Sequence, residues 1–267
     1  MKKKWISAAL SLTLASTTIT TMMPAYTVHA EEAATQGTTY YISSAKGDDK
    51  NDGTSKDKPF KTLNKINELT LKPGDQVLLE KGSVFNDQYL HLKGSGSAET
   101  PITVSTYGEG KRPQINTNGR GQWELNYGKP LDNKNHKWHG TVSSSILLKD
   151  VEYVEISGLE ITNDRDTAND PEKDMEYNNS AVMDRTGVAG VAKDNGTVDH
   201  IVLNDLYIHD VTGNVYNKHM TNGGIYFIVE TPTNEATTGI ARYNDVAIRN
   251  CYLDTVNRWG IAVGYTY

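Results

Sequence analysis

The chain has 267 residues, 37% of them hydrophobic, and its 27 Lys and Arg against 33 Asp and Glu give a net charge of −6. An acidic chain does not suit nucleic acid or anionic lipid as a general partner, because both carry negative charge themselves. The chain has one cysteine, Cys251, so it excludes an intramolecular disulfide and must gain its stability from packing.

The first thirty residues have the features of a secretory signal peptide. Lys2 to Lys4 form a positive start, the apolar run Trp5 to Ala15 follows, and small residues precede a cleavage point after Ala30. The run is too short to span a bilayer, and no later segment is apolar enough for membrane insertion. We therefore predict a secreted protein with a signal peptide over 1–30 and a flexible leader over 31–37. Loss of the three lysines takes the net charge from −6 to about −9.

Short elements separated by Gly- and Pro-bearing turns follow the leader. Leu63, Ile66 and Leu69 recur at helical spacing, which predicts one short amphipathic helix. Alternating or apolar runs bounded by turn residues predict strands. The predicted strands are Tyr40–Ser43, Gln76–Glu80, Thr100–Tyr107, Pro113–Asn116 and Ser143–Leu148.

From residue 150 the pattern repeats, with copies at 154–163, 201–210 and 246–255. In each copy apolar residues alternate with other residues, a Gly, Asp or Asn follows, and the alternation then resumes. A strand that begins near a glycine comes after each copy. Alternation turns every second side chain to one face, and the small residue marks a corner, so the chain coils with its apolar side chains inside. Stacked coils bury rows that one coil could not. Cys251 takes the place of Leu159 and Leu206 in this pattern, which predicts a core position.

The start of the chain resembles a known superfamily. Tyr40–Ser43, Asn51–Thr54, Lys58–Leu63 and Lys72–Asp75 resemble the opening of the pectate-lyase-like right-handed β-helix proteins, and the three copies resemble their repeat. The resemblance implies an all-β, right-handed parallel β-helix over 38–267 with a short N-terminal capping helix. The superfamily includes polysaccharide lyases, glycoside hydrolases and non-catalytic adhesins, and the lacto-N-biosidases are one candidate relative.

The end of the chain follows an apolar strand with no polar cap, at Tyr265 to Tyr267. The last coil of a solenoid exposes strand edges and core unless something covers it. We therefore expect this β-helix to be truncated at its C-terminus. A C-terminal remainder or a second chain would complete it.

An acidic loop after residue 163 is the strongest local cluster of oxygen ligands. Carboxylates in a loop are the ligands that Ca²⁺ takes. The alternative, which the composition favours, is a solvated insert with Arg165 and Lys173 as counter-charges. The candidate metal ligands are Asp164, Asp166, Asp170 and Asp174, with Glu172 and Glu176 in the same loop.

The catalytic candidates depend on the reaction. A lyase needs a basic residue, for which Arg185, Lys218 and Arg258 qualify, whereas a glycosidase needs two carboxylates about 5–10 Å apart. The carboxylate candidates are Asp184, Asp210, Glu230 and Asp254, although Asp210 and Asp254 also suit turn positions. Nothing in the sequence pairs any two of them. We select Asp210, Asp254 and Arg258.

Outward aromatic side chains are candidates for sugar binding. Tyr226 alternates out of phase with its apolar neighbours, and Trp259 precedes the next glycine-led strand, so the two could form a stacking ladder for sugar rings. Glu230, at the start of a long polar loop, is a third candidate substrate-binding residue. The sequence thus predicts a secreted protein that cleaves a poly- or oligosaccharide, as a lyase or a glycoside hydrolase. The alternative is a non-catalytic glycan-binding or adhesin module.

Overall fold

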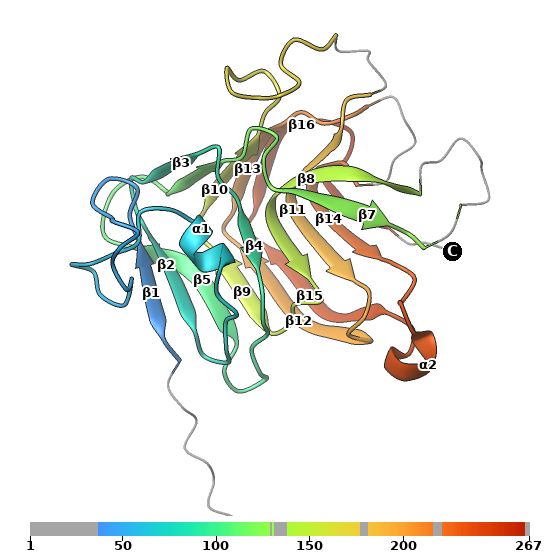
Figure 1. Cartoon of the computed structure of the whole chain (residues 1–267), viewed down its shortest axis with the longest axis horizontal. Helices are drawn as coiled ribbons and strands as arrows, with labels where there is room; N and C mark the ends of the chain where they lie inside the picture. The colour runs from blue at the N-terminus through green and yellow to red at the C-terminus, as the bar shows by residue number, and fades with distance from the viewer. Residues whose placement is uncertain (1–36, 129, 131–137, 177–180, 216–220, 265–267) are drawn as a thin grey trace, which may run out of the picture. The chain divides into compact units, whose positions relative to one another are not determined.

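The computed structural model describes residues 37–128, 130, 138–176, 181–215 and 221–264, which lie in one compact unit, Ala34–Tyr267. The predicted signal peptide and residues 31–36 of the leader lie outside the described residues. The described residues form seventeen strands and two one-turn helices, and sixteen of the strands make up three parallel sheets (Figure 1). The all-β expectation is confirmed.

The three sheets are defined here by their strands, in the order in which neighbours pair. The first sheet contains β1 (Thr39–Ile42), β2 (Gln76–Glu80), β5 (Ile102–Tyr107), β9 (Val154–Ser157), β12 (Thr197–Asn204) and β15 (Arg242–Arg249). The second sheet contains β3 (Val84–Asn86), β6 (Gln114–Asn116), β10 (Glu160–Asn163), β13 (Tyr207–Val211) and β16 (Tyr252–Val256). The third sheet contains β4 (Leu90–Leu92), β8 (His139–Lys149), β11 (Asp184–Ala192), β14 (Gly223–Val229) and β17 (Ile261–Val263).

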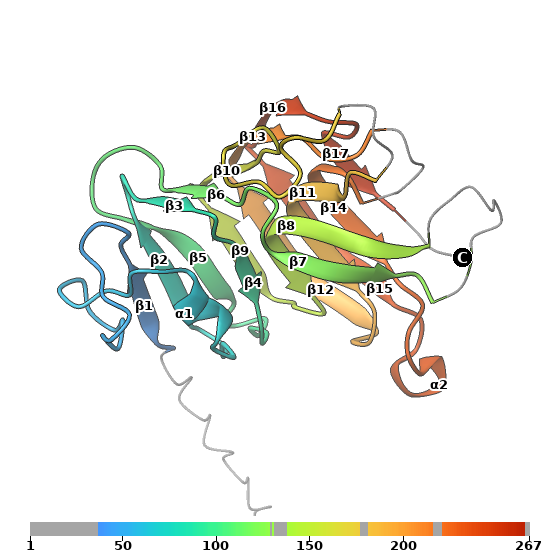
Figure 2. The same ribbon diagram turned by 45° about the horizontal axis from the view of Figure 1, so that its top comes forward.

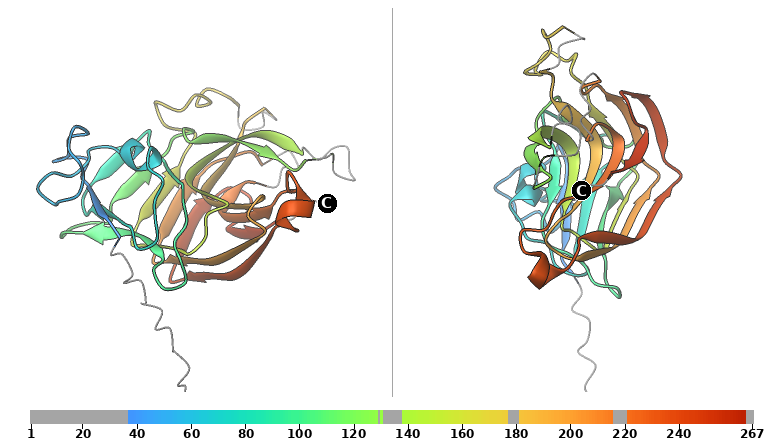
Figure 3. Two further views of the ribbon diagram at one scale, coloured as in Figure 1. Left: turned by 60° about the horizontal axis from the view of Figure 1, so that its bottom comes forward. Right: turned by 90° about the vertical axis from the view of Figure 1, so that its right-hand side faces the viewer.

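The chain visits the three sheets in turn and repeats the circuit, so each circuit, or coil, adds one strand to each sheet. The last three coils are β9–β10–β11, β12–β13–β14 and β15–β16–β17. Figure 2 shows the second sheet running across all coils that contain it, and the right view in Figure 3 faces the last coil. The predicted corners between first and second sheet are Gly158, Asp205 and Asn250, with φ of 75°, 54° and 52°. These left-handed values explain why small polar residues or glycine stand there.

The core lies inside the coils and is built from rows of stacked apolar side chains. In the second sheet Phe85, Ile115, Ile161 and Ile208 stand in register, and each is fully buried. Alternation along each strand turns these residues inward and their neighbours outward. Cys251 is partly buried and packs against this core as predicted, and burial raises the pKa of its thiol.

The two helices are short. The predicted helix is found as α1 (Asn64–Asn67), and its expected apolar face is correct, since Leu63 and Ile66 are buried and Leu69 packs against the core. A second helix, α2 (Glu235–Thr238), lies in the predicted loop between β14 and β15. No helix among the described residues is both long and apolar enough to cross a bilayer.

A hairpin adds a second layer outside the third sheet. The antiparallel strand β7 (Gln122–Asn126) pairs with the first part of β8. Side chains of this hairpin and the outward residues of β11 and β14 form a second buried cluster. Its buried members are Leu125, Tyr127, Val142, Leu147, Ala189, Val191, Tyr226 and Ile228.

Candidate functional site

The outer face of the second sheet carries two rows of side chains, which are polar or aromatic except for Val84 at one end. Register pairing aligns one residue from each of five strands, and these residues point outward because they alternate with the buried row. The first row is Asn86, Asn116, Thr162, His209 and Asp254. The second row, two residues earlier on each strand, is Val84, Gln114, Glu160, Tyr207 and Tyr252.

A groove of about 370 Å³ lies over the part of these rows that runs from β3 to β13, and it is called the polar groove below. Tyr207, Tyr252 and Asp254 lie beside it and are not among its described lining residues. Its floor includes Asn116, Thr162 and His209, and the loop after β10 contributes Asp164 and Asn169. Side chains of the floor bond one another across coils: Asn116 Nδ2 donates to Asn86 Oδ1 at 2.7 Å, and the Thr162 hydroxyl donates to Asn116 Oδ1 at 2.9 Å. These bonds pre-position amide and hydroxyl groups along the groove.

Carboxylates gather at the β13 end of the polar groove. His209 lies between two of them, with Nδ1 at 2.7 Å from Asp210 Oδ2 and Nε2 at 3.1 Å from Glu160 Oε1. The pKa of Tyr207 is raised by the loss of solvent around its hydroxyl and by the neighbouring carboxylates, with Asp254 foremost among them. The structure therefore brings the predicted catalytic residues Asp210 and Asp254 to one region, beside a histidine and a tyrosine.

An aromatic surface adjoins these carboxylates. The ring centroids of Tyr207 and Tyr252 lie 5.4 Å apart, and Tyr207 stacks on the His209 ring at 4.3 Å. Tyr252 is 63% exposed on the last strand of the second sheet. Neither tyrosine was among the predicted binding residues, although Tyr207 and Tyr252 occupy the same position in the second and third repeat copies.

The predicted calcium ligands do not gather around one point. Asp164 accepts from the Thr212 hydroxyl at 2.8 Å and lines the polar groove, whereas Asp166 and Asp174 lie beside Arg165 and Lys173. The described residues contain no group of three His, Cys, Asp or Glu arranged to hold a metal ion. Calcium binding stays a prediction.

Asp170 and Glu172 have a different role from the one predicted. Both accept from the fully buried guanidinium of Arg185, whose Nη2 lies 3.0 Å from Asp170 Oδ1 and 2.7 Å from Glu172 Oε2. Asp170 is therefore an ion-pair partner in the interior rather than an open metal ligand. This cluster ties the loop that borders the polar groove to β11.

Two predicted substrate-binding residues are buried. Glu230 is fully buried, accepts from the Asn126 backbone at 3.1 Å and lies 3.1 Å from Lys193 Nζ, so it anchors the hairpin from beneath. Tyr226 points outward from its strand as predicted, but the hairpin covers it and leaves it 4% exposed. The prediction of surface positions for these two side chains is wrong. The hairpin covers Tyr226, and lysines from other coils lie against Glu230.

The remaining predicted residues lie at the last coil. Trp259 is 46% exposed, but register aligns Tyr226 with Ala262, so Trp259 and Tyr226 form no ladder. The Arg258 guanidinium lies 5.9 Å from the centre of the Trp259 ring, and Arg258 is not among the described residues that line the polar groove. Lys218, the other open candidate for a lyase base, lies outside the described residues.

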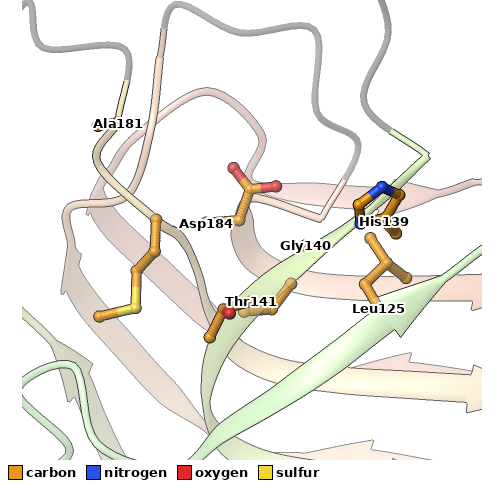
Figure 4. Close-up of a pocket in the computed structure, with 8 residues that line it drawn as sticks. Leu125, His139, Gly140, Thr141, Ala181 and Asp184 are labelled. Atoms are coloured by element: carbon orange, nitrogen blue, oxygen red, sulfur yellow. The ribbon is translucent and has the colours of Figure 1, made fainter.

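A second, smaller cavity lies against the hairpin and is called the hairpin pocket below. It has a volume of about 170 Å³ and is lined by Leu125 of β7, His139, Gly140 and Thr141 of β8, and Asp184 at the start of β11 (Figure 4). Asp184 is 2% exposed and is the carboxylate of this pocket. The pocket draws its lining from elements about 60 residues apart, which the repeat pattern does not connect.

Comparisons with known proteins give one consistent result. No protein-family model matches the chain. A lacto-N-biosidase of Bifidobacterium longum subsp. longum is 45% identical over 291 aligned residues, which cover 97% of this chain and 18% of that protein. Crystal structures of a GH136 lacto-N-biosidase from Eubacterium ramulus, native and as a selenomethionine derivative, match at 52% and 51% identity.

Both crystal structures give a TM-score of 0.80 over 85% of this chain and 36% of theirs. The chain spans about a third of the solved enzyme and less than a fifth of the curated relative. Nearly the whole chain is therefore similar in sequence, and most of it in fold, to part of the lacto-N-biosidases, which are glycoside hydrolases.

Proposed function

We propose that this chain is part of a secreted glycoside hydrolase that acts on neutral oligosaccharides, as a lacto-N-biosidase does. The observation that carries the proposal is the similarity of 45–52% identity to proteins of that name, which extends over 97% of the chain in one comparison. The proposed fold is the right-handed parallel β-helix of the pectate-lyase-like superfamily, supported by the threefold circuit of the chain through parallel sheets.

The polar groove supports a neutral substrate. Its described lining consists of amides, hydroxyls, a histidine and the carboxylates Asp164 and Asp210, and includes no Lys or Arg. A polyuronate would meet these two carboxylates in the lining and would be repelled by them. Amide and carboxylate groups are suitable partners for sugar hydroxyls, which both donate and accept. This lining favours a hydrolase over a uronate lyase, and Arg258 then has no role as a lyase base.

Asp210 and Asp254 are the proposed catalytic pair. Asp254 stands in register with His209, which precedes Asp210 on the neighbouring strand. Neighbouring strands lie about 4.8 Å apart, which is compatible with the roughly 5–10 Å separation of glycosidase carboxylates. In such a pair one carboxyl group protonates the leaving oxygen, and the other acts as nucleophile or activates water. Tyr252 would pack against a sugar ring bound beside them.

The proposed partner at the last coil is a further coil of β-helix, from the remainder of a longer chain or from a second chain. β15, β16 and β17 are each the last strand of their sheet among the described residues. Ile261 and Val263 are 50% and 76% exposed, whereas their register partners Ile225 and Phe227 are 0% and 2% exposed. Parallel strands added in register would pair the open edges and bury these side chains.

The test is an activity assay of the purified chain, alone and with its proposed completing coils. A lacto-N-bioside with a chromogenic leaving group is expected to release that group, and a polyuronate is expected to give no ultraviolet-absorbing product. Formation of unsaturated uronides would contradict the proposal and favour a lyase. Binding of a neutral oligosaccharide without release, in the completed protein, would favour the non-catalytic module instead.

The aromatic surface of Tyr207 and Tyr252 beside the polar groove makes a separate prediction. Tyr252→Ala is expected to weaken binding of an oligosaccharide ending in lacto-N-biose by about tenfold, because an aromatic contact of about 1 kcal/mol and its buried area are lost. Isothermal titration calorimetry measures the effect. Tyr153→Ala, which removes a tyrosine at the corner just before β9 of the first sheet, is the matched control and should leave affinity unchanged. Equal affinity of Tyr252→Ala and the unchanged protein would show that the ligand binds elsewhere.

A further inference from the structure

The outer face of the first sheet carries a groove of about 380 Å³ over the last three described coils. Its described lining includes Glu155 of β9, His200 of β12 and Arg249 of β15. It shares no described lining residue with the polar groove or the hairpin pocket. A histidine that contacts two carboxylates lies in this groove and has no part in the proposed hydrolysis.

His200 lies between carboxylates from the coils on either side. Its Nδ1 lies 2.7 Å from Asp245 Oδ2, and its Nε2 lies 3.1 Å from Glu155 Oε1. Because β9, β12 and β15 belong to successive coils, this one ring connects all of the last three described coils. The similar contacts of His209 reach the preceding coil and its own coil, so they connect two coils only.

The backbone at this bridge is unusual. Tyr153, His200 and Asp245 stand at the same position of the three coils, one residue before a register-aligned row of the first sheet. Their φ values are 50°, 48° and 54°, all in the left-handed region. Glycine adopts this conformation with the least strain. Three successive coils instead keep a side chain there, and these side chains contact one another: the rings of Tyr153 and His200 stack with centroids 6.2 Å apart.

The bridge is complete only when the imidazole ring carries two protons. Ionised carboxylates accept hydrogen bonds and cannot donate, so both ring nitrogens of His200 must donate to satisfy Asp245 and Glu155. A neutral ring would turn a lone pair toward one of the two carboxylates. The hydrogen bonds to Asp245 and Glu155 raise the pKa of His200, against a smaller opposite effect from its partial loss of solvent.

The surroundings of the ring are mainly acidic. The further charged groups near the bridge are Glu99, Glu152, Asp199 and Arg249. Loss of solvent and then the charges of the three carboxylates raise the pKa of the Tyr153 phenol, which stacks on His200. Arg249, the basic residue in the described lining besides His200, lies at the opposite end of β15 from Asp245. This charge distribution favours a protonated ring.

We propose that Glu155, His200 and Asp245 form a proton-dependent clamp, which holds the last described coil to the two coils before it while the ring is protonated and loosens when the ring loses its proton. Below about pH 6.5 the ring is protonated in both the folded and the unfolded chain, so the full stabilisation is present. Above about pH 6.5 the unfolded ring loses its proton first. The stabilisation then falls until the folded ring is neutral as well.

Hydrogen exchange of the full chain, followed by mass spectrometry at about pH 6 and about pH 8.5, tests the clamp. The readout is the protection factor of peptides from 242–256, which corrects for the faster chemical exchange at high pH. In the unchanged chain this protection should fall about three- to tenfold between the two pH values, the effect expected for two partly exposed ion pairs. Burial raises the pKa of the Cys251 thiol in the same segment, so this group stays protonated.

Three variants separate the proton from the contact. His200→Asn removes the ring but suits a left-handed backbone, and it should give low protection of 242–256 at both pH values. His200→Arg keeps a cation that can donate to both carboxylates and does not titrate, so protection should stay high at both. His91→Gln removes a histidine from β4 of the third sheet and is the matched control. It should keep the fall of the unchanged chain, because the His91 ring is already neutral at pH 6.

Equal protection at both pH values in the unchanged chain, or an undiminished fall in His200→Asn, would overturn the proposal. Nitrogen-15 NMR of the histidine rings tests it without relying on a variant's fold, with His200→Asn used only to assign the signal. A His200 ring that loses its proton below about pH 6.5 would also overturn the clamp. These readouts involve no substrate, so a chain that shows the clamp but hydrolyses no oligosaccharide would contradict the proposed function alone.

Discussion

Replacement of Arg185 by methionine is expected to lower the free energy of unfolding by about 3–5 kcal/mol, the usual cost of removing one partner of a buried ion pair. Arg185 is fully buried and is the cation between Asp170 and Glu172, which are 4% and 8% exposed. Without it, two nearly buried carboxylates face each other without a counter-charge. The penalty is the desolvation of those charges rather than the lost contact alone.

Urea denaturation of matched variants measures this cost. The triple variant Arg185→Met, Asp170→Asn, Glu172→Gln removes every charge of the cluster and should recover a large part of the loss, because neutral amides are less costly to bury. Lys46→Met breaks the more exposed pair between Lys46 and Glu80 and should change stability by less than about 1 kcal/mol. If Arg185→Met lowered the free energy of unfolding as little as Lys46→Met does, the assignment of Arg185 as the counter-charge of two buried carboxylates would be contradicted.

The same cluster should affect ligand binding. The loop held by Arg185 places Thr167 and Asn169 in the polar groove, and Asn169 Nδ2 donates to Asp87 Oδ2 across coils at 2.9 Å. Arg185 touches no described groove atom, so it acts as a positioning residue. In buffer without urea, and at a temperature at which Arg185→Met remains folded, the oligosaccharide affinity of this variant should still be weaker than that of the unchanged chain. The triple variant should regain part of that affinity.

Most strands and corners of this fold could be predicted because the signals are local. Alternation in the three repeat copies assigned the faces of β9, β10, β12 and β13, and the small residues Gly158, Asp205 and Asn250 marked the corners that the φ values confirm. The short strands β3 and β4 escaped prediction. Three residues between turn residues give only a weak alternation, and β6, which has the same length, was predicted only as part of the run Pro113–Asn116.

The candidate sites were harder to predict from the sequence, because their residues come together only through the register of neighbouring strands. Asn86, Asn116, Thr162, His209 and Asp254 are about 30 to 47 residues apart, and their alignment follows from the lengths of loops that no pattern specifies. The alternation of apolar residues correctly predicted that Tyr226 points outward from its strand. It could not predict that β7 covers this side chain. Burial of Glu230 likewise depends on Lys149 and Lys193, which arrive from two other coils.

Acidification should destabilise the protein through His91 before most carboxylates are protonated. His91 lies on β4, donates from Nε2 to the Ser144 carbonyl at 3.1 Å in its Nε2–H form, and packs on the Tyr89 ring. Burial lowers its pKa from 6.5 to about 4, and the positive charge of Lys93 acts in the same direction. The ring is therefore expected to stay neutral in the folded state over a range where it is protonated in the unfolded chain.

The sign of the effect follows from this difference. Above about pH 6.5 both states hold a neutral ring, so His91 contributes no pH dependence. As the pH falls from about 6.5 to about 4, the unfolded state binds a proton that the folded state excludes, and the free energy of unfolding falls by about 2–3 kcal/mol. His91→Gln keeps a donor for Ser144 and should remove this part of the pH dependence.

Urea unfolding at several pH values between about 4 and 7 separates His91 from the other titrating groups. Carboxylates contribute equally to the unchanged chain and to His91→Gln, so the difference between the two curves belongs to the histidine. His139→Gln, at an exposed position of β8, is the control and should keep the full acid dependence. Parallel curves for His91→Gln and the unchanged protein would mean that the ring is already protonated inside the fold. The outer face of β4 would then have to accommodate a cation beside Lys93, an arrangement that its packing against Tyr89 and Ser144 disfavours.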